Sequence, residues 1–287
     1  MTCFLQMRPK HTRLLSAGER FTKLREMPAD SFQTTISVAT AADPFLAALA
    51  ERWREMQQAP AASPAGVGFR PAREAAEMRR LCRQASAAGA PPDAIARVWR
   101  SLCGDMLVNR GLKTVYVAGG DIAQSIEAAR GYFGFAPAIV PLVDIRDALD
   151  RADQTQGVVS CVPWPEHAGI GQWWPMLNEN RFRNLYIVAG WPNLPGSPSV
   201  APKMAVIGRI GMESSGDDDT LATAHDDHYM AERLLGDLGF KAEVVARARS
   251  LALIRIGEFV SVDDRRVELA RKAGLDGLRI VGVRPRP

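Results

Sequence analysis

The sequence predicts a multi-domain protein of the α+β class, and three observations support this. Apolar residues recur at helical spacing from Asp43 to about Arg110. From Thr114 to Ala189, short β-branched runs alternate with helical patterns. The residues from Met204 onwards follow the order strand, helix, strand, strand, helix, strand. With 287 residues, 47% hydrophobic and 24% charged, the chain has the balance of a folded protein of two or three units.

The overall charge favours an anionic small molecule as partner. The formal net charge is +4 and the isoelectric point about 9.0, with both signs mixed along the chain. No Lys/Arg run or aromatic–basic pattern predicts nucleic-acid binding. No apolar run approaches the ~20 residues of a membrane span, so no membrane association is expected. The scattered cysteines form no CxxC pair and suit a reduced, cytoplasmic protein: Cys3, Cys82, Cys103 and Cys161.

Three helices are predicted first. Residues 1–42 precede them as a tail, and the composition leaves open whether it is disordered. Asp43 and Pro44 make a good helix start, since a capping carboxylate is followed by proline at the first helical position. A second helix is expected over 72–87, and a third begins at Asp93 and ends before Gly111. The third helix carries an apolar stripe formed by Ile95, Val98, Trp99, Leu102, Cys103, Met106 and Leu107.

Alternating strands and helices follow, and this spacing predicts a parallel sheet with right-handed crossovers. The expected strands are Thr114–Ala118, Ala138–Val143, Gly157–Val162 and Leu185–Ala189. The expected helices are Asp121–Phe133, Ile145–Ala152 and Gly171–Leu177. A linker at Gly196–Ser199 leads to the last part.

The last part has a ferredoxin-like order of elements. The expected elements are the strand Met204–Ile210, the helix Thr220–Leu238, the strands Ala242–Ala248 and Leu251–Phe259, the helix Arg265–Ala273 and the strand Leu278–Val283.

Three stretches in the helical part resemble the all-helical chorismate mutases. Residues Ala50–Glu55 resemble the end of their first helix, Arg70–Leu81 their second helix, and Asp93–Asn109 their third. The resemblance implies a chorismate mutase-like domain over residues 43–111. Helices of this type pair as dimers, so we expect a homodimer, and the wide apolar stripe of the third helix supports that expectation.

The rest of the chain resembles the proteins in which such a mutase is fused to a prephenate dehydratase. Ala128–Gly134 and Gly157–Pro163 look like the first lobe of a dehydratase, which implies a single-lobe α/β unit over 112–197. The end, Leu278–Pro285, resembles the closing strand of an ACT regulatory domain, which implies an ACT-like unit over 200–287.

The resemblance implies a mutase site that is only partly present. Chorismate rearrangement needs cations around two carboxylates and an ether oxygen, held in a compact geometry. Arg52, Arg73 and Glu74 match the family, while its Lys position falls in Pro60–Pro64 and its Gln position aligns with Arg110. Arg110 is a candidate donor to the ether oxygen, or an arginine that interacts with the dipole at a helix end. Arg73 and Glu74 are ligand contacts or an exposed charge pair.

The dehydratase-like part lacks more of its site. Gly119, Gly120 and Asp121 precede a helix and are candidate carboxylate-binding residues, although a plain strand-to-helix turn explains them as well. The family's Thr-Arg-Phe signature is present only as Asn180 followed by Arg and Phe, and there is no room for a second lobe. We therefore expect no prephenate dehydratase activity.

Other motifs favour structural roles. His225 and His228 form a pair for which a solvated polar face is favoured over a metal, and no metal is predicted. There is no Walker motif, GxGxxG or GxSxG, so no cofactor is predicted. Four tryptophans form either a small core beneath a loop or a binding surface, and burial is favoured: Trp164, Trp173, Trp174 and Trp191.

Two functions therefore compete. The first is an enzyme of aromatic amino-acid metabolism, a chorismate mutase with an altered site that acts through Arg52, Arg73, Glu74 and Arg110. The second is a non-catalytic regulatory relative that binds a small carboxylate, either chorismate- or prephenate-like, or an aromatic amino acid. The sequence leaves open whether catalysis is retained, because an electrostatic site can be rebuilt with other cations.

Overall fold

The computed structural model describes residues 68–166, 172–193 and 202–286, together with the helical positions Ala47, Ala50, Glu51 and Arg54. The described residues from 68 onwards belong to one compact unit. Most of the predicted first helix, including Arg52, lies outside the described residues, as does the predicted linker at 196–199.

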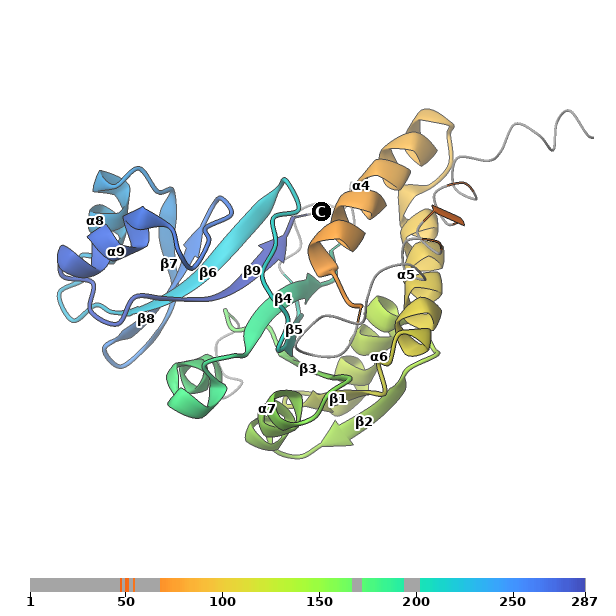
Figure 1. The fold of residues 1–287 in the computed structure, drawn as a ribbon, viewed down its shortest axis with the longest axis horizontal. Helices are drawn as coiled ribbons and strands as arrows, with labels where there is room; N and C mark the ends of the chain where they lie inside the picture. The colour runs from red at the N-terminus through yellow and green to blue at the C-terminus, as the bar shows by residue number, and fades with distance from the viewer. Residues whose placement is uncertain are drawn as a thin grey trace, which may run out of the picture. The chain divides into compact units, whose positions relative to one another are not determined.

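The described part begins with two helices, continues with alternating strands and helices, and ends with a strand-rich part (Figure 1). Its helices are α4 (Pro71–Ala87), α5 (Pro92–Asn109), α6 (Ile122–Phe133), α7 (Ile145–Gln154), α8 (Ala231–Asp237) and α9 (Arg265–Lys272), with two 3-10 turns, η1 (Trp174–Asn178) and η2 (Asn180–Phe182). Its strands are β1 (Thr114–Ala118), β2 (Ala138–Leu142), β3 (Val158–Pro163), β4 (Tyr186–Trp191), β5 (Met204–Gly208), β6 (Asp218–His225), β7 (Ala242–Ala248), β8 (Leu251–Ile256) and β9 (Arg279–Pro285).

Local chemistry explains where the helices begin. Proline stands at the start of both α4 and α5, where its missing N–H is not needed. The side chain of Asp121 caps α6, that of Asp144 caps α7, and that of Asp264 caps α9. Each accepts a hydrogen bond from a backbone N–H of the first turn, which has no partner within the helix. The predicted second and third helices and the strand–helix alternation after Thr114 are thus confirmed.

All nine strands join one sheet in the order β2-β1-β3-β5-β4-β9-β6-β8-β7. Strand β1 pairs in parallel with both β2 and β3, as the alternation predicts. Strand β5 runs antiparallel between β3 and β4. The last four strands pair antiparallel with one another, and β9 joins β4 in parallel.

At the start of the last part, one predicted element is wrong, and one predicted strand is confirmed but belongs to a different part of the sheet. The predicted helix Thr220–Leu238 is instead the strand β6, followed by the short helix α8. The predicted first strand, Met204–Ile210, is β5, which pairs with β3 and β4 and not with the last four strands. A strand buried on both faces reads as a continuous apolar run, and its period does not distinguish it from a helix. The order strand, helix, strand, strand, helix, strand is present, and it begins at β6.

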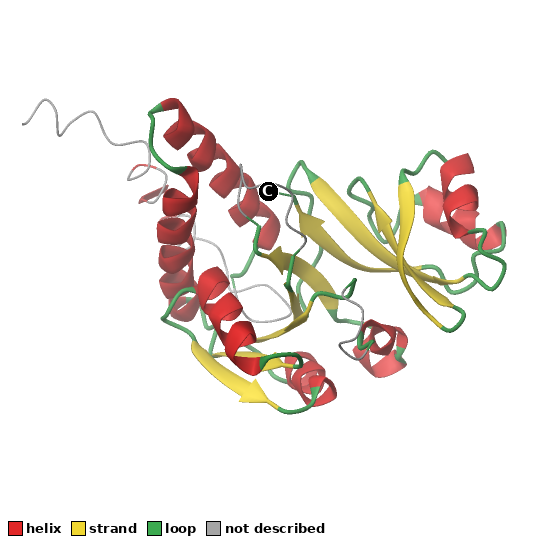
Figure 2. Ribbon diagram, turned by 180° about the vertical axis from the view of Figure 1, so that it is seen from behind, coloured by secondary structure: helices red, strands yellow, loops and turns green. Residues whose placement is uncertain are grey.

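Three apolar clusters cover the two faces of the sheet. Helices α5 and α6 pack on one face of the first strands, around Val115, Val159 and Phe133. On the opposite face, α7 and the 172–185 segment form a second cluster that continues onto the last strands at Leu221 and Leu253. Helices α8 and α9 lie together on the other face of these last strands (Figures 1 and 2). The second cluster therefore lies under both halves of the sheet.

The join between the two halves is narrow and depends on a glycine. Strands β4 and β9 pair at a single register position, Ile187 opposite Gly282. A Cβ atom added to Gly282 would lie 2.5 Å from both the Cβ and the carbonyl oxygen of Ile187. Since no such contact is tolerated in a protein core, only glycine allows the two backbones to approach this closely.

We therefore expect Gly282→Ala to destabilise the protein. The added methyl group would force β4 and β9 apart, at a cost of about 1–3 kcal/mol or more in the free energy of unfolding. Urea denaturation followed by circular dichroism would measure the change.

The matched control is Gly236→Ala. Gly236 lies in α8, and a Cβ atom there would meet nothing within 4 Å. Because alanine is the better helix former, this variant should be as stable as the parent or up to about 1 kcal/mol more stable. Equal stability of the two variants would refute the close approach at Gly282.

Candidate functional site

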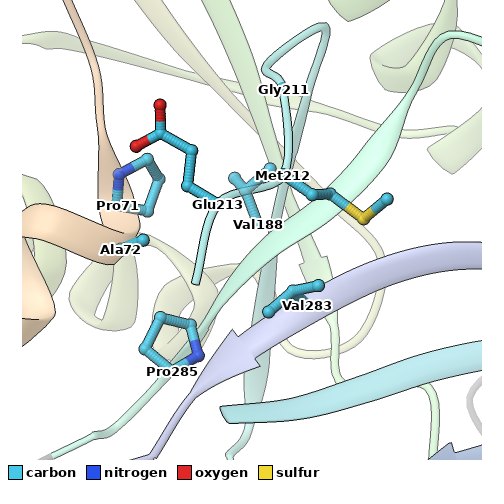
Figure 3. Close-up of a pocket in the computed structure, with 8 residues that line it drawn as sticks. All are labelled: Pro71, Ala72, Val188, Gly211, Met212, Glu213, Val283 and Pro285. Atoms are coloured by element: carbon cyan, nitrogen blue, oxygen red, sulfur yellow. The ribbon is translucent and has the colours of Figure 1, made fainter. Parts of the chain in front are cut away.

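A small pocket lies where the start of α4 meets β4, β9 and the loop at 211–213 (Figure 3). Its volume of about 10 Å³ is enough for about one water molecule. Glu213, one of its lining residues, accepts two hydrogen bonds from the Arg70 guanidinium, at 3.1 and 2.8 Å. The pocket is therefore a packing gap and does not accommodate a substrate. Its lining residues are Pro71, Ala72, Val188, Gly211, Met212, Glu213, Val283 and Pro285.

The chemically distinctive feature of the helical part is a buried ion pair. Glu74 of α4 and Arg100 of α5 are 1% and 2% exposed. Arg100 Nη1 lies 3.4 Å from Glu74 Oε2. Charged residues are almost never buried this completely unless they are paired, because each loses its hydration. The pair therefore fixes α4 against α5 at one register.

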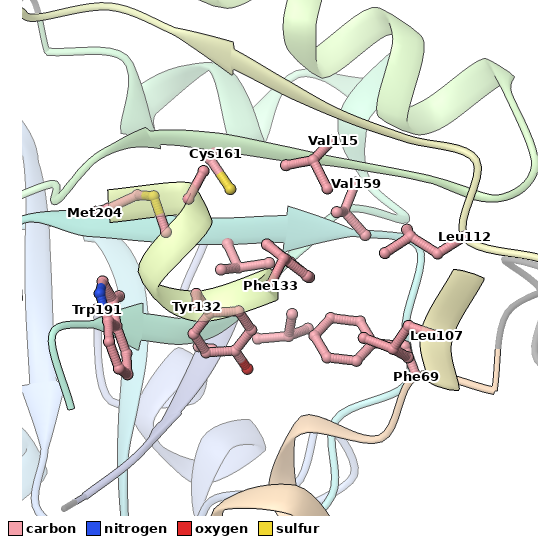
Figure 4. Packing of buried hydrophobic residues seen from close by; sticks show 14 of the residues in the cluster. Phe69, Leu107, Leu112, Val115, Tyr132, Phe133, Val159, Cys161, Trp191 and Met204 are labelled. Carbon is pink, nitrogen blue, oxygen red and sulfur yellow. The ribbon is translucent and has the colours of Figure 1, made fainter. Parts of the chain in front are cut away.

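An aromatic pair from two other elements covers Arg100. Its guanidinium carbon lies 4.1 Å from the ring centroid of Tyr132 on α6 and 5.8 Å from that of Trp191 on β4. The two rings meet edge to face, with centroids 5.8 Å apart. Figure 4 shows Tyr132 between Trp191 and Phe69, within the first apolar cluster. Cation–π contacts of this kind strengthen when water is excluded. Arg100 thus links α5 to α6 and to the sheet.

The pKa values of Arg100 and Tyr132 are both shifted upward, so neither group changes its charge near neutral pH. Burial lowers the pKa of Arg100, but Tyr132, Glu74 and Cys103 raise it by more, so the net shift is upward. Burial also raises the pKa of the Tyr132 hydroxyl, and the opposing effect of Arg100 is smaller. At neutral pH the guanidinium is charged and the phenol is not.

Glycines bring these elements into contact. A Cβ atom on Gly104 of α5 would lie 1.7 Å from the carbonyl oxygen of Phe133, at the end of α6. A Cβ atom on Gly131 of α6 would lie 2.7 Å from the Trp191 indole nitrogen. The cluster is therefore built at a close three-way approach of α5, α6 and β4. Nothing larger than hydrogen fits between them at these two points.

The sequence-predicted mutase residues lie in different environments. Glu74 faces Arg100 in the interior, whereas its neighbour Arg73 is exposed. Arg110 directly follows α5 and is half-buried, with its side chain against Gly68. Arg73 and Arg110 lie at the same end of the α4–α5 hairpin, because α4 begins where α5 ends. Arg52 lies outside the described residues.

The predicted carboxylate-binding turn is tightly built. Gly119 and Gly120 both have positive φ, at 78° and 65°. A Cβ atom on Gly119 would lie 2.6 Å from the Ile145 side chain. The Asp121 carboxylate accepts hydrogen bonds from the backbone N–H groups of Ala123 and Gln124, at 2.9 and 3.2 Å. A ligand carboxylate at this helix start would have to compete with that cap.

The four tryptophans are buried, as predicted, with Trp164, Trp173 and Trp174 in the second cluster and Trp191 in the first. Among the described residues, no three His, Cys, Asp or Glu side chains come together as a metal site would require. None of the described helices is both long and apolar enough to cross a membrane.

Sequence reasoning does not single out Arg100, Tyr132 or Trp191 as one cluster. One feature of the sequence indicates that Arg100 is buried. It lies four residues after Ala96 and three before Cys103, on the same face of the helix, and both of these residues are buried. An arginine on the buried face of a helix requires a partner such as Glu74. Which side chain from α6 or β4 would cover it depends on the tertiary fold.

No protein-family model and no curated protein matches the chain. Among solved structures, the prephenate dehydratase from Streptococcus mutans is 15% identical, with a TM-score of 0.42, over 61% of this chain and 100% of that one. A prephenate dehydratase from Arthrobacter aurescens in complex with L-Phe is 14% identical, with a TM-score of 0.41, over 60% and 90%. GqqA, described as a novel type of quorum quenching acylase, is 14% identical, with a TM-score of 0.42, over 61% and 95%. These likenesses are distant, and no activity of this chain follows from them.

Breaking the buried pair should be strongly destabilising. In Glu74→Gln the charge of Arg100 stays in the interior without a counter-charge, which costs about 3–5 kcal/mol. Replacing both residues, in Glu74→Gln with Arg100→Met, should recover much of this loss, because no isolated charge then remains. Urea denaturation of the single and double variants measures the coupling.

Glu77→Gln is the matched control on the same helix. Glu77 pairs with Arg80 one turn away, where both side chains are partly exposed, so its loss should cost about 0.5 kcal/mol or less. A cost below about 1 kcal/mol for Glu74→Gln would show that the pair does not hold the helices together.

Proposed function

We propose that this protein is a non-catalytic, regulatory binding protein for a small carboxylate, related in descent to the proteins of aromatic amino-acid metabolism. The position of Glu74 carries the proposal. A mutase would direct this carboxylate at its substrate, whereas here it faces Arg100 beneath two aromatic rings. Because the Glu74 carboxylate pairs with Arg100 in the interior, it is not available to orient a ligand.

Two arginines support the binding part of the proposal. Arg73 and Arg110 lie at one end of the hairpin, on α4 and directly after α5. A guanidinium recognises a carboxylate through two parallel N–H donors, and it stays charged at every physiological pH. The family resemblance supplies the probes, which are chorismate, prephenate and the aromatic amino acids. We propose no prephenate dehydratase activity, since the signature threonine is replaced by Asn180.

The alternative function is a chorismate mutase with an altered site. In that case Arg52 and Arg73 would hold the carboxylates, and Arg110 would donate to the ether oxygen. The placement of Arg73 and Arg110 at one end of the hairpin favours this alternative over other enzyme classes. The missing family lysine and the buried Glu74 oppose it.

Binding and turnover assays separate the two functions. We expect one of the probes to raise the melting temperature of the wild-type protein, because a ligand that binds only the native state stabilises it. We also expect the absorbance of chorismate to decrease no faster with the protein than in the uncatalysed reaction. Arg73→Ala should abolish the thermal shift, while Glu77→Gln should keep it. If no probe changes the melting temperature, the carboxylate-binding proposal fails.

Chorismate turnover above background would instead establish the mutase. Arg110→Ala should then lower kcat by on the order of 100-fold, as for the loss of one oxyanion donor. Arg110→Gln restores the residue that the family has at this position and should lower kcat by less. Equal effects of the two substitutions would exclude Arg110 from the ether oxygen.

We also propose that the protein is a homodimer through its helical part. Trp99, Cys103, Met106 and Leu107 of the apolar stripe are buried within the chain, whereas Val98 is 48% exposed and Ile95 and Leu102 are half-buried. A second copy would cover this remaining strip.

Sedimentation at tens of micromolar should show a dimer, and Val98→Asp should convert it to a monomer. A charge buried at the centre of an interface is strongly unfavourable. Val108→Asp, on the same helix but off the stripe, should leave the dimer intact. A monomeric wild type would reject the proposal.

A further inference from the structure

A second polar cluster lies where η1 crosses the face of the last strands. Thr223 of β6 and Arg279 of β9 are register partners, so their side chains leave the sheet on the same face. Thr223 donates a hydrogen bond of 2.9 Å from Oγ1 to Asn178 Oδ1, at the end of η1. Three elements thus bring Asn178, Thr223 and Arg279 together.

This cluster has donors without acceptors. Asn178 Nδ2 and Arg279 Nη1 are both inaccessible to water, and neither has a hydrogen-bond partner among the described residues. The Thr223 hydroxyl already uses its proton on Asn178. Buried donors are nearly always satisfied in native proteins, so two on neighbouring side chains indicate a missing acceptor.

The charge at this point is also unbalanced. Arg279 Nη2 donates to the backbone oxygen of Arg183 at 2.8 Å, and no carboxylate of the described residues pairs with Arg279. Burial and then the like charge of Arg183 lower the pKa of Arg279, while Tyr186 raises it. The neighbouring Arg181, in contrast, pairs with Asp150 and Glu179. Arg279 therefore has no carboxylate partner among the described residues, and its one printed contact to Arg183 is with the backbone oxygen.

We propose that Arg279, Arg183 and the Asn178 amide form a binding site for an oxyanion, the carboxylate or phosphate group of a small molecule. An oxyanion supplies both missing features, since its oxygens accept from Asn178 Nδ2 and Arg279 Nη1 and its charge offsets the two arginines. A water molecule would satisfy the donors but would leave the charge unbalanced. Arg183 is exposed, and in this proposal the anion enters beside it. This site lies on η1 and β9, and it does not depend on the function proposed for the α4–α5 hairpin.

Thermal denaturation at constant ionic strength tests the site, with sodium phosphate in one arm and sodium acetate in the other. Once the probe exceeds its Kd about fivefold, the melting temperature of the wild-type protein should rise by about 2–4 °C. Phosphate stabilises many proteins non-specifically, so the site-specific signal is the difference between variants. Arg279→Met should lose the specific shift. Arg181→Met is the control, because it removes a neighbouring charge that already has carboxylate partners, and it should keep the shift.

Each result of this experiment either supports or refutes the oxyanion site. A shift with phosphate alone assigns a phosphate group, and a shift with acetate alone assigns a carboxylate. Equal shifts in wild type, Arg279→Met and Arg181→Met, or no shift in any of them, would overturn the proposal. If Arg279→Met fails to fold, Asn178→Ala provides the second test, measured as a weaker affinity for phosphate or acetate in a binding titration.

Discussion

The arrangement of the helices over the sheet depends on one buried charge, the guanidinium of Arg100. A cation without water must find both a counter-charge and a polarisable surface. Glu74 provides the charge from α4, and the rings of Tyr132 and Trp191 provide the surface from α6 and β4. Because these partners come from three different elements, the requirement fixes the positions of all three around α5. The glycines at 104 and 131 allow the approach, since any side chain there would overlap its neighbour.

The partners that Arg100 requires attach the helical part directly to the sheet. The helices are not a separate layer, because Leu107 of α5 shares one apolar cluster with Val115, Val159 and Tyr132. Glu74, which pairs with Arg100, is part of the attachment of the hairpin to the sheet. We propose that anionic ligands bind elsewhere, at the end of the hairpin near Arg73 and Arg110 and at Arg279.

The sequence predicts those features that local patterns control. Helical spacing predicts α4 and α5, β-branched runs predict β1 and β3, and the tryptophans are buried as predicted, although Trp191 lies in a different cluster from the other three. It does not predict β6, because Leu221, Ala222 and Ala224 form a run that suits a helix as well as a buried strand. The antiparallel insertion of β5 also depends on long-range pairing, which no local pattern encodes. In the site, the sequence groups Arg73 with Glu74 as ligand contacts or as an exposed charge pair, and it does not predict that Glu74 is buried against Arg100 while Arg73 is exposed.

The central claim is that the Glu74–Arg100 pair belongs to the core and does not contact a ligand. The most direct measurement is side-chain nuclear magnetic resonance of the Glu74 carboxyl carbon and the Arg100 guanidinium nitrogens, recorded while chorismate is titrated into the intact protein. We predict that both signals stay in place while resonances at the Arg73 end of the hairpin move. A change of the Glu74 and Arg100 signals that saturates with chorismate would contradict it, because the ligand would then reach the pair.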